Sequence, residues 1–257
     1  MAIITLTTDM GIKDPHLGSV KGYIMSQMHN IQIVDITHQV TPFNIAEAAY
    51  IVRNCYSDFP HKTIHIIGVD SDSDDNKDIL LISYKNQYFI VHDNGIISLI
   101  IEGQPDKIIK LHKKSNTESI FPLKDVMARA ACTLAKNVNE YDLGSYIKDF
   151  RTITTLNPIL ENEMIRGTVI YIDNYGNAIT NIRKSHLERF GPDRPINIHF
   201  SKKHMLTQIS ENYSDVPVGE AVCLFGSSGL FEVAINKGNA SQLLGLQQKN
   251  IVLIEFI

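Results

Sequence analysis

The chain of 257 residues contains no tryptophan, only three cysteines and no long hydrophobic run. Cys55, Cys132 and Cys223 lie far apart and none belongs to a CxxC pair, so the sequence gives no disulfide framework and is typical of a reducing cytoplasm. No apolar run approaches about 20 residues, the length that a membrane-spanning helix needs. The sequence begins directly with a strand pattern, so we expect no signal peptide. These absences predict a cytoplasmic protein that does not enter a membrane.

Clustered positive charge is also absent. No basic block of five or more residues occurs and the net charge is −4, so nucleic acid is not an expected partner. The ten histidines form no HExxH motif and have no CxxC partner, and we therefore predict no zinc site. No other segment requires a metal. The proportion of hydrophobic residues, 44%, is that of an ordinary globular protein with a sizeable core.

The first part of the chain alternates between strand and helix patterns. Apolar runs over residues 3–6, 31–36 and 63–69 predict buried strands. Apolar residues recur at spacings of three and four between Leu17 and Met28, and Asn44 can cap a second helix. The resulting β-α-β-α-β order predicts a parallel, doubly wound sheet. A hairpin around Lys85-Asn86 and a helix over residues 125–136 follow.

The second part of the chain has a different character. Residues 150–163 include a proline and show no sustained period, which indicates an extended linker. Short strand patterns separated by turns then predict an antiparallel barrel or sandwich, with strands over residues 168–172, 196–200, 221–225, 231–235 and 251–256. We therefore predict an α/β domain over residues 1–150, a linker over 151–163 and a smaller β-barrel-like domain over 164–257.

Acidic residues follow the first predicted strand. In α/β sheets, ligands bind at the carboxyl ends of the strands, and Asp9 and Asp14 emerge there. A carboxylate can accept hydrogen bonds from both hydroxyls of a ribose. The alternative is that Asp9 and Asp14 are turn and N-cap residues. His16 is a candidate for the same pocket, whereas we interpret His38 as a structural hydrogen-bonding residue.

Asp70 opens an acidic loop after the third predicted strand. The spacing of Asp70, Asp72 and Asp74 imitates the start of an EF-hand, but Asp75 and Leu81 stand where that motif needs Gly and Glu. We interpret this segment as a functional loop at a strand end and not as a calcium site.

Two loops in the second part could read a ligand. Asn177 offers a donor and an acceptor that suit the edge of a purine, and Tyr175 could stack on its face. The run from Gly226 to Gly229 exposes N–H groups that could hold a carboxylate. It lacks the lysine of a P-loop and the spacing of a nucleophile elbow. The alternative for both loops is a tight turn without ligand.

Several ordered motifs together resemble the S-adenosylmethionine hydroxide adenosyltransferase family, which includes the fluorinating and chlorinating enzymes. They are TLTTDMGIKD with the following GSVKG, IVDITHQVTPFNIAEAA, the FPHKTIH segment that leads to Val69-Asp70, DNG, IDNYGNAITNI and FGSSGLFEVAINKG. The resemblance runs from Ile3 to the C-terminus. It implies an N-terminal α/β domain, a C-terminal β-barrel-like domain and a homotrimer. Each active site would lie between the first domain of one subunit and the second domain of its neighbour, with S-adenosylmethionine as substrate and no further cofactor.

The resemblance also implies ligand-binding roles in the first domain. Asp9 matches the acid that holds the ribose hydroxyls, and Phe43 stands at the place of an aromatic residue that packs on the ribose. Asp14 matches an acid near the amino group of methionine.

In the second domain, Asp173 matches another acid near that amino group. Tyr175 and Asn177 match the aromatic and amide residues that read adenine, and Ser227 matches a residue at the methionine end.

The resemblance is less complete at the reacting centre. Hydrolysing members direct water at the ribose C5′ and expel L-methionine, and Asp70 matches their water-orienting acid. Lys77 stands where an Arg is expected and keeps the positive charge. Pro122 stands where a His is expected and has no side-chain donor. Leu123 occupies the place of a Ser in the fluorinating branch, so halogenation is not better supported.

Two functions stay open at this point. The first is hydrolysis of S-adenosylmethionine to adenosine and L-methionine, with Asp70 orienting the water and Lys77 holding its charge. The second is a binding module for S-adenosylmethionine or adenosine with little or no turnover. An unrelated nucleoside binder, a third idea, predicts no affinity for the methionine half of the ligand.

Overall fold

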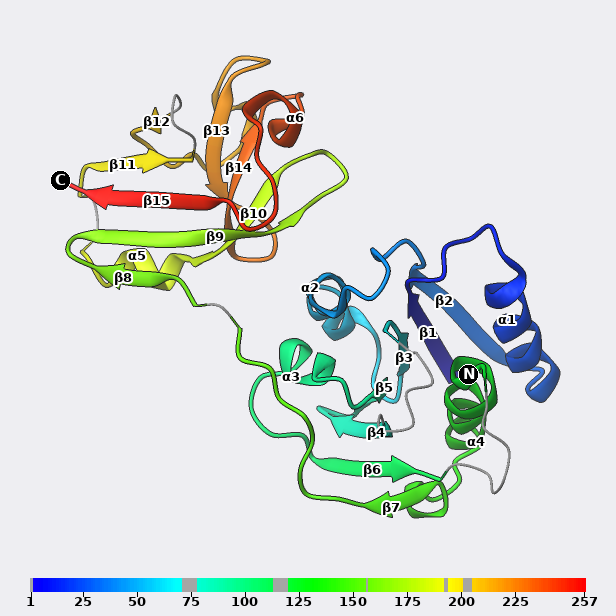
Figure 1. Ribbon diagram of the computed structural model, residues 1–257. Coiled ribbons are helices and arrows are strands. Elements are labelled where there is room, and N and C mark those ends of the chain that lie inside the picture. The colour runs from blue at the N-terminus through cyan, green and yellow to red at the C-terminus, as the bar shows by residue number, and fades with distance from the viewer. Residues whose placement is uncertain (1, 71–77, 113–119, 156, 192–193, 201–204) are drawn as a thin grey trace. The chain divides into compact units, whose positions relative to one another are not determined.

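The computed structural model describes residues 2–70, 78–112, 120–155, 157–191, 194–200 and 205–257. The chain divides into two compact units, Met1–Thr154 and Thr155–Ile257 (Figure 1). The division falls inside the segment predicted as linker, and three residues of that segment form strand β8 (Ile159–Glu161). The finer domain limits of residues 1–150 and 164–257 stay a prediction.

Unit 1 is built on a mixed sheet in which the strand order is β2-β1-β3-β5-β4-β6-β7. Strands β1, β2, β3 and β5 run parallel, and β4, β6 and β7 are antiparallel to their neighbours. The strands are β1 (Ala2–Thr8), β2 (Ile31–Thr37), β3 (Ile64–Gly68), β4 (Ile79–Tyr84), β5 (Gln87–His92), β6 (Lys107–Leu111) and β7 (Gly144–Tyr146). The prediction of an N-terminal α/β domain is confirmed.

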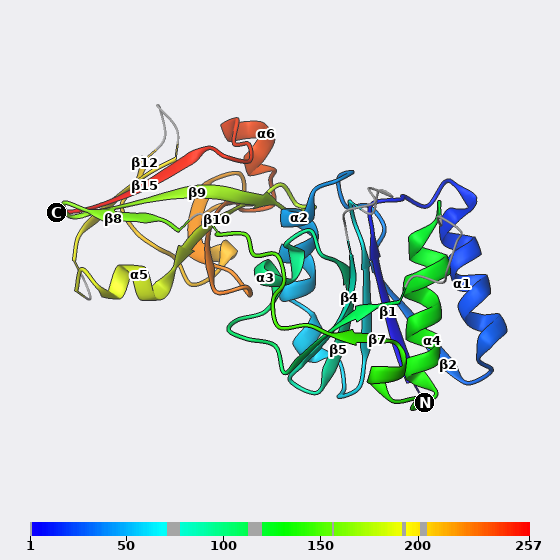
Figure 2. The ribbon, with the colours of Figure 1, turned by 60° about the horizontal axis from the view of Figure 1, so that its bottom comes forward.

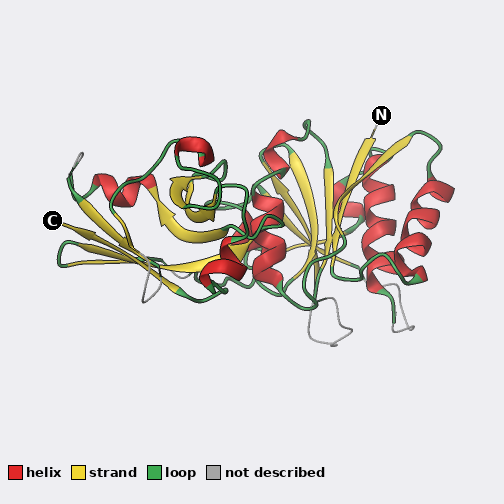
Figure 3. Cartoon of the chain, turned by 90° about the horizontal axis from the view of Figure 1, so that it is seen from above, coloured by secondary structure: helices red, strands yellow, loops and turns green. Residues whose placement is uncertain are grey.

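Helices cover both faces of this sheet (Figures 2 and 3). Helices α1 (Pro15–Gln27) and α4 (Arg129–Ala135) share one hydrophobic core with Ile4, Leu6 and Ile66. Helices α2 (Ile45–Arg53) and α3 (Ile96–Ile100) share the other with Ile67 and Phe89. Single 3₁₀ turns lie at Tyr56–Asp58 and Glu140–Asp142. Burial on both faces explains why the parallel strands are continuous apolar runs.

Local sequence signals account for several element ends. The Asn44 side chain accepts a hydrogen bond from the N–H of Glu47 and caps α2, as predicted. Lys85 and Asn86 both have positive φ, 48° and 61°, the two-residue hairpin geometry that fits the twist between β4 and β5.

The predicted helix over residues 125–136 differs from the observed one. It begins as a π-helix, Leu123–Ala128, directly after Pro122 and continues as α4. Wide turns of this kind are frequently found at functional sites. Sequence periodicity did not reveal it, because the apolar spacing of a short π-helix resembles that of an α-helix.

Unit 2 is an antiparallel, nearly closed β-barrel, as predicted, with strand order β12-β11-β15-β9-β10-β14-β13 and β8 paired to β9. Its strands, besides β8, are β9 (Met164–Ile172), β10 (Ala178–Arg183), β11 (Ile196–His199), β12 (Met205–Leu206), β13 (Ala221–Phe225), β14 (Leu230–Ile235) and β15 (Ile251–Phe256). Helices α5 (Lys184–Glu188) and α6 (Ala240–Leu244) and a 3₁₀ turn at Tyr213–Asp215 complete it. Phe231, Val233 and Val252 lie in its core.

None of the helices in the described ranges has the length and apolar character to cross a membrane.

Candidate active site

In unit 1, the carboxylate of Asp9 connects three segments that follow strand ends. Asp9 comes directly after β1, and its Oδ2 accepts hydrogen bonds from the main-chain N–H of Phe43, at 2.9 Å, and of Asp70, at 3.2 Å. Phe43 lies between β2 and α2, and Asp70 lies two residues after β3. Oδ1 of Asp9 accepts no hydrogen bond from the part of the chain that the structure describes. One carboxylate oxygen is therefore fixed by the fold, and the other has capacity for a ligand hydroxyl.

Both main-chain donors to Asp9 have a strained backbone. Phe43 has φ 65° and Asp70 has φ 50°, the left-handed region that non-glycine residues rarely adopt. Each such residue costs on the order of 1–3 kcal/mol and persists only where the surroundings impose it, commonly at functional sites. The Phe43 side chain is 62% exposed, although it is large and apolar. The backbone strain and the exposed ring do not stabilise the fold, so they indicate that the segments around Asp9 have a functional role.

Asn94, in the DNG motif, fixes the main chain next to Asp70. The buried Asn94 side chain donates to the carbonyl of Val69 at 3.2 Å and accepts from the N–H of Ile96 at 3.2 Å. Gly95 has φ 93°, and a Cβ there would lie 2.5 Å from the Ile153 side chain. The motif was visible in the sequence, but its role was not. Asn94 follows β5 and fixes the main chain that follows β3.

The side chain of Leu123 packs against Gly68, the last residue of β3. Leu123 is fully buried, and its Cδ1 lies 2.6 Å from where a Cβ on Gly68 would be. Pro122 precedes it and supplies no side-chain donor. The ring of His16 meets Phe121 edge-on, with centroids 5.4 Å apart. The side chains of Phe121, Pro122 and Leu123 therefore supply only hydrocarbon in this segment.

Two other predicted residues are less informative. Asp14 is exposed at the N-cap position of α1, but its side chain makes no capping hydrogen bond. Lys77 lies outside the described residues, as do Asp72, Asp74 and Asp75 of the acidic loop. Where the chain is described, no three His, Cys, Asp or Glu side chains converge into a group that could hold a metal ion.

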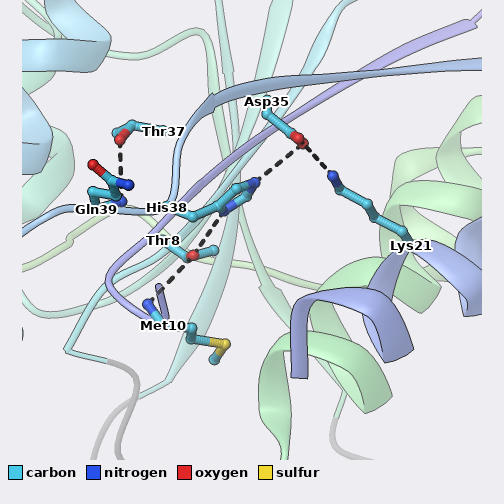
Figure 4. A network of polar contacts seen from close by, with 7 residues as sticks. All are labelled: Thr8, Met10, Lys21, Asp35, Thr37, His38 and Gln39. Atoms are coloured by element: carbon cyan, nitrogen blue, oxygen red, sulfur yellow. Dashed lines mark hydrogen bonds and ion pairs between the residues drawn. The ribbon is translucent and has the colours of Figure 1, made fainter. Parts of the chain in front are cut away.

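A polar network runs from Thr8, the residue before Asp9, through His38 and Asp35 to Lys21 (Figure 4). Thr8 Oγ1 lies 2.9 Å from Nδ1 of His38, whose Nε2 lies 3.1 Å from Oδ1 of Asp35. Lys21, reaching from α1, donates to Oδ2 of Asp35 at 2.5 Å. Burial acts to raise the pKa of Asp35, but the Lys21 hydrogen bond and the His38 contact outweigh it and hold the pKa below its usual range.

In unit 2, the loop between β9 and β10 is organised by Asp173. Its Oδ1 accepts from the N–H groups of Tyr175, at 2.9 Å, and Asn177, at 2.8 Å, and its Oδ2 accepts from the Asn177 side chain at 2.9 Å. Asn177 is thereby only 6% exposed, whereas the Tyr175 side chain is 76% exposed. The loop is a turn, and this turn orients the amide of Asn177 and leaves the Tyr175 ring exposed, whereas its ligand-binding role stays a prediction.

The loop from Gly226 to Gly229 is a tight hairpin between β13 and β14. The N–H of Gly226 donates to the carbonyl of Leu230 at 3.0 Å, and Gly229 has φ 70°.

A hollow of about 720 Å³ brings all four predicted residues of unit 2 together. Its lining includes the predicted Asp173, Tyr175, Asn177 and Ser227, together with Tyr213, Lys237 and Asn239, which the sequence did not single out. Such a volume suits a small organic ligand.

Glu232 is a buried carboxyl behind this hollow. Tyr213 donates a short hydrogen bond to its Oε1, and a Cβ on Gly226 would lie 2.5 Å from its Oε2. Burial raises the pKa of Glu232, with a further rise from the charge of Asp173, although the Tyr213 hydrogen bond acts to lower it. The ring of Tyr213 is thus fixed from behind by a side chain that sequence patterns placed only in a strand.

Another hollow, about 510 Å³, lies in unit 1 at the opposite end of the sheet, around the start of β1 and residues 60–64. None of the predicted site residues lines it, and we do not assign the site to it.

Comparison with known proteins decides the family. Residues 4–144 match the family model described as SAM hydroxide adenosyltransferase N-terminal domain, and residues 167–253 match the corresponding C-terminal domain. The chain belongs to the S-adenosylmethionine (SAM) hydroxide adenosyltransferase family. The resemblance predicted from the motifs is thereby confirmed, and with it a family that binds SAM and includes SAM hydrolases and fluorinases.

The curated relatives are distant but align over nearly the full length. The (R)-S-adenosyl-L-methionine hydrolase of Methanocaldococcus jannaschii is 28% identical, and the alignment covers 95% of this chain and 92% of that protein. The (R)-S-adenosyl-L-methionine hydrolase of Thermus thermophilus is 25% identical, and the alignment covers 96% of this chain and 97% of that protein. A fluorinase of an Actinoplanes species is 21% identical over 91% of each chain. A crystal structure of an uncharacterized conserved protein from Thermotoga maritima is 27% identical, has a TM-score of 0.88 and covers 98% of this chain and 99% of its own.

Proposed function

We propose that this protein hydrolyses SAM to adenosine and L-methionine. The oxygen of a water molecule forms a bond to the ribose C5′, and the C5′–S bond breaks with its electron pair going to sulfur. The sulfonium becomes the neutral thioether of methionine, and the water proton passes to a base. Two relatives that align over nearly the whole chain are named as (R)-SAM hydrolases, so we propose the (R) sulfonium epimer as substrate.

The observation that carries the proposal is the arrangement of Asp9 and Asp70. One Asp9 oxygen is held by two N–H groups, and the other can accept from the ribose hydroxyls. Asp70 is tied to Asp9 through its own main chain and would orient the attacking water and take its proton. By its match to the family, Lys77 would place a positive charge beside Asp70 and so stabilise the ionised carboxylate. Phe43 would pack on the ribose, and Asp14 would attract the methionine amino group.

Unit 2 would read the two ends of the ligand. Tyr175 would stack on adenine, and the oriented amide of Asn177 would pair with its edge. Asp173 would attract the methionine amino group, and Ser227 would bind the carboxylate end. All four line one hollow, which supports assigning them to one ligand.

We further propose that three copies assemble and that unit 1 of one copy works with unit 2 of its neighbour. A mixing experiment tests this arrangement. Asp9→Asn and Asn177→Ala subunits, each inactive alone, should recover about a quarter of wild-type activity when unfolded and refolded together at equal amounts, because a quarter of shared sites then carry neither change. No recovery in mixed assemblies would contradict shared sites.

A second candidate function is a SAM or adenosine binding module with little or no turnover. Pro122 favours it, because the donor expected at this position is absent and the neighbouring Leu123 adds only hydrocarbon.

Product analysis separates the two functions. Purified protein is incubated with each sulfonium epimer of SAM, with chloride present and absent, and adenosine is followed by chromatography. Hydrolysis predicts adenosine from the (R) epimer irrespective of chloride, lost in Asp70→Asn and retained in Asp106→Asn. The latter makes the same charge change at a residue that accepts from the N–H of Lys85 in the β4–β5 hairpin. Tight binding without adenosine would establish the binding module instead.

A further inference from the structure

His38 holds the main chain on both sides of Asp9. Its Nδ1 lies 2.9 Å from the hydroxyl of Thr8, the residue immediately before Asp9. Its carbonyl accepts a hydrogen bond of 2.7 Å from the N–H of Gly11, two residues after Asp9. Thr8 is fully buried and His38 is 5% exposed, so water does not compete for these contacts.

The far side of the imidazole is fixed as well. Nε2 of His38 faces the carboxylate of Asp35, which in turn accepts from Lys21 (Figure 4). A carboxylate on this side favours a proton on Nε2 and leaves Nδ1 as the acceptor of the Thr8 hydroxyl proton. In that tautomer, the hydrogen bond towards β1 runs from the Thr8 hydroxyl to Nδ1 of His38.

We propose that His38 is a positioning residue for Asp9. Through Thr8 and Gly11 it sets the path of residues 8–11, and this path orients Oδ1 of Asp9, the oxygen to which no described residue donates. A binding group must lie within about 0.5 Å of its productive place, so a small shift of this segment is enough to weaken a ligand contact. The consequence for ligand affinity rests on the proposed function, whereas the consequence for the main chain does not.

The same strand provides a matched control. Thr5 Oγ1 lies 2.8 Å from Nδ1 of His65, also between buried side chains, but three residues away from Thr8 and where His65 stacks on Phe89. Thr5→Val and Thr8→Val thus each remove one Thr–His hydrogen bond from β1. Purely structural roles predict the same outcome for both variants.

The experiment compares amide hydrogen exchange at Gly11 and adenosine affinity in wild type, Thr8→Val and Thr5→Val. We expect similar losses of global stability in the two variants. Only Thr8→Val should speed amide exchange at Gly11 and weaken adenosine binding. Relative to Thr5→Val, we expect about a tenfold change in the exchange rate and in the dissociation constant, which corresponds to the loss of one buried hydrogen bond. Equal Gly11 exchange in the two variants would overturn the proposal. If wild type binds no adenosine, the proposed function fails, and the exchange comparison still decides this inference.

Two changes at His38 test which side of the ring matters. An Asn oxygen takes about the place of Nδ1 and can still accept from Thr8, whereas a Gln nitrogen takes about the place of Nε2 and reaches only Asp35. We expect His38→Asn to keep Gly11 exchange within about threefold of wild type and His38→Gln to raise it by about tenfold. The reverse order would contradict positioning through Thr8.

Discussion

The main-chain N–H of Asp70 donates a hydrogen bond of 3.2 Å to the carboxylate of Asp9, which lies 61 residues earlier in the chain. The two acids that we assign to ribose binding and to water activation are therefore held on one scaffold. Asp70 makes this contact with φ 50°, a conformation that is commonly found at functional sites when a non-glycine residue adopts it. It follows that a change at Asp9 that removes this acceptor oxygen will alter the placement of Asp70.

The left-handed backbone of Phe43 predicts a trade of function against stability. Phe43→Gly should raise the free energy of unfolding by about 0.5–1 kcal/mol, because glycine adopts φ 65° without strain. It should also weaken adenosine binding, because the exposed ring is lost. Denaturant unfolding and calorimetric titration measure the two effects.

Lys85→Gly is the control for that change, since Lys85 has φ 48° in the β4–β5 hairpin. It should stabilise the protein to a similar extent and leave adenosine affinity unchanged. If Phe43→Gly binds adenosine as well as wild type, the ribose-packing role is wrong.

The tight contact at Gly176 predicts a large cost of adding one methyl group. Gly176 has φ 83°, and a Cβ there would lie 2.2 Å from side-chain atoms of Asn239, which caps α6. Gly176→Ala should lower the free energy of unfolding by about 2–4 kcal/mol, from backbone strain and overpacking together.

Gly219 separates the two causes of that cost, because it has φ 90° and a Cβ there would meet no atom within 4 Å. Gly219→Ala should cost only about 1 kcal/mol, the backbone part alone. Equal losses in the two variants, measured by urea unfolding, would show that the Asn239 contact does not matter.

Buried His65 predicts acid sensitivity. Burial lowers the pKa of His65 to about 4, although the hydrogen bond with Gln87 acts to raise it. The unfolded chain therefore takes up a proton more readily than the folded one as pH falls. Stability from this residue is complete above pH about 6.5 and decreases below it, by about 3 kcal/mol near pH 4.

Unfolding curves at pH 7 and pH 4 for wild type and His65→Gln measure this loss, because the contributions of the carboxyl groups cancel in the comparison. The variant should lose about 3 kcal/mol less than wild type between the two pH values. Parallel losses would mean that His65 titrates normally in the folded state.

The sequence predicted the parts of the fold that depend on local chemistry. The Asn44 cap and the Lys85-Asn86 turn follow from single side chains and backbone preferences, and the apolar runs follow from burial on both faces of the sheet. Strand β6 and the edge strand β7 were missed, because their pairing depends on partners far along the chain rather than on their own pattern.

The candidate site also contains residues that the sequence predicted and residues that it did not. Asp173, Tyr175, Asn177 and Ser227 line one hollow, as one ligand would require, but their individual roles stay predictions. Tyr213 reaches that hollow from a short turn with no motif of its own, and Lys237, although it lies within the FGSSGLFEVAINKG motif, had no role assigned to it from the sequence. The two hydrogen bonds that Asp9 accepts could not be predicted either, because their donors are main-chain groups of Phe43 and Asp70 that the tertiary fold brings together.

The central claim is that Oδ1 of Asp9 binds the ribose hydroxyls, and its most direct test is the affinity for adenosine and 2′,3′-dideoxyadenosine in wild type and Asp9→Asn. The Asn oxygen can keep the contacts to Phe43 and Asp70, so the fold should persist. We predict that wild type prefers adenosine by roughly 10- to 100-fold, the value of hydrogen bonds to a charged group, and that Asp9→Asn shows little preference. Equal discrimination by the two proteins would contradict the account.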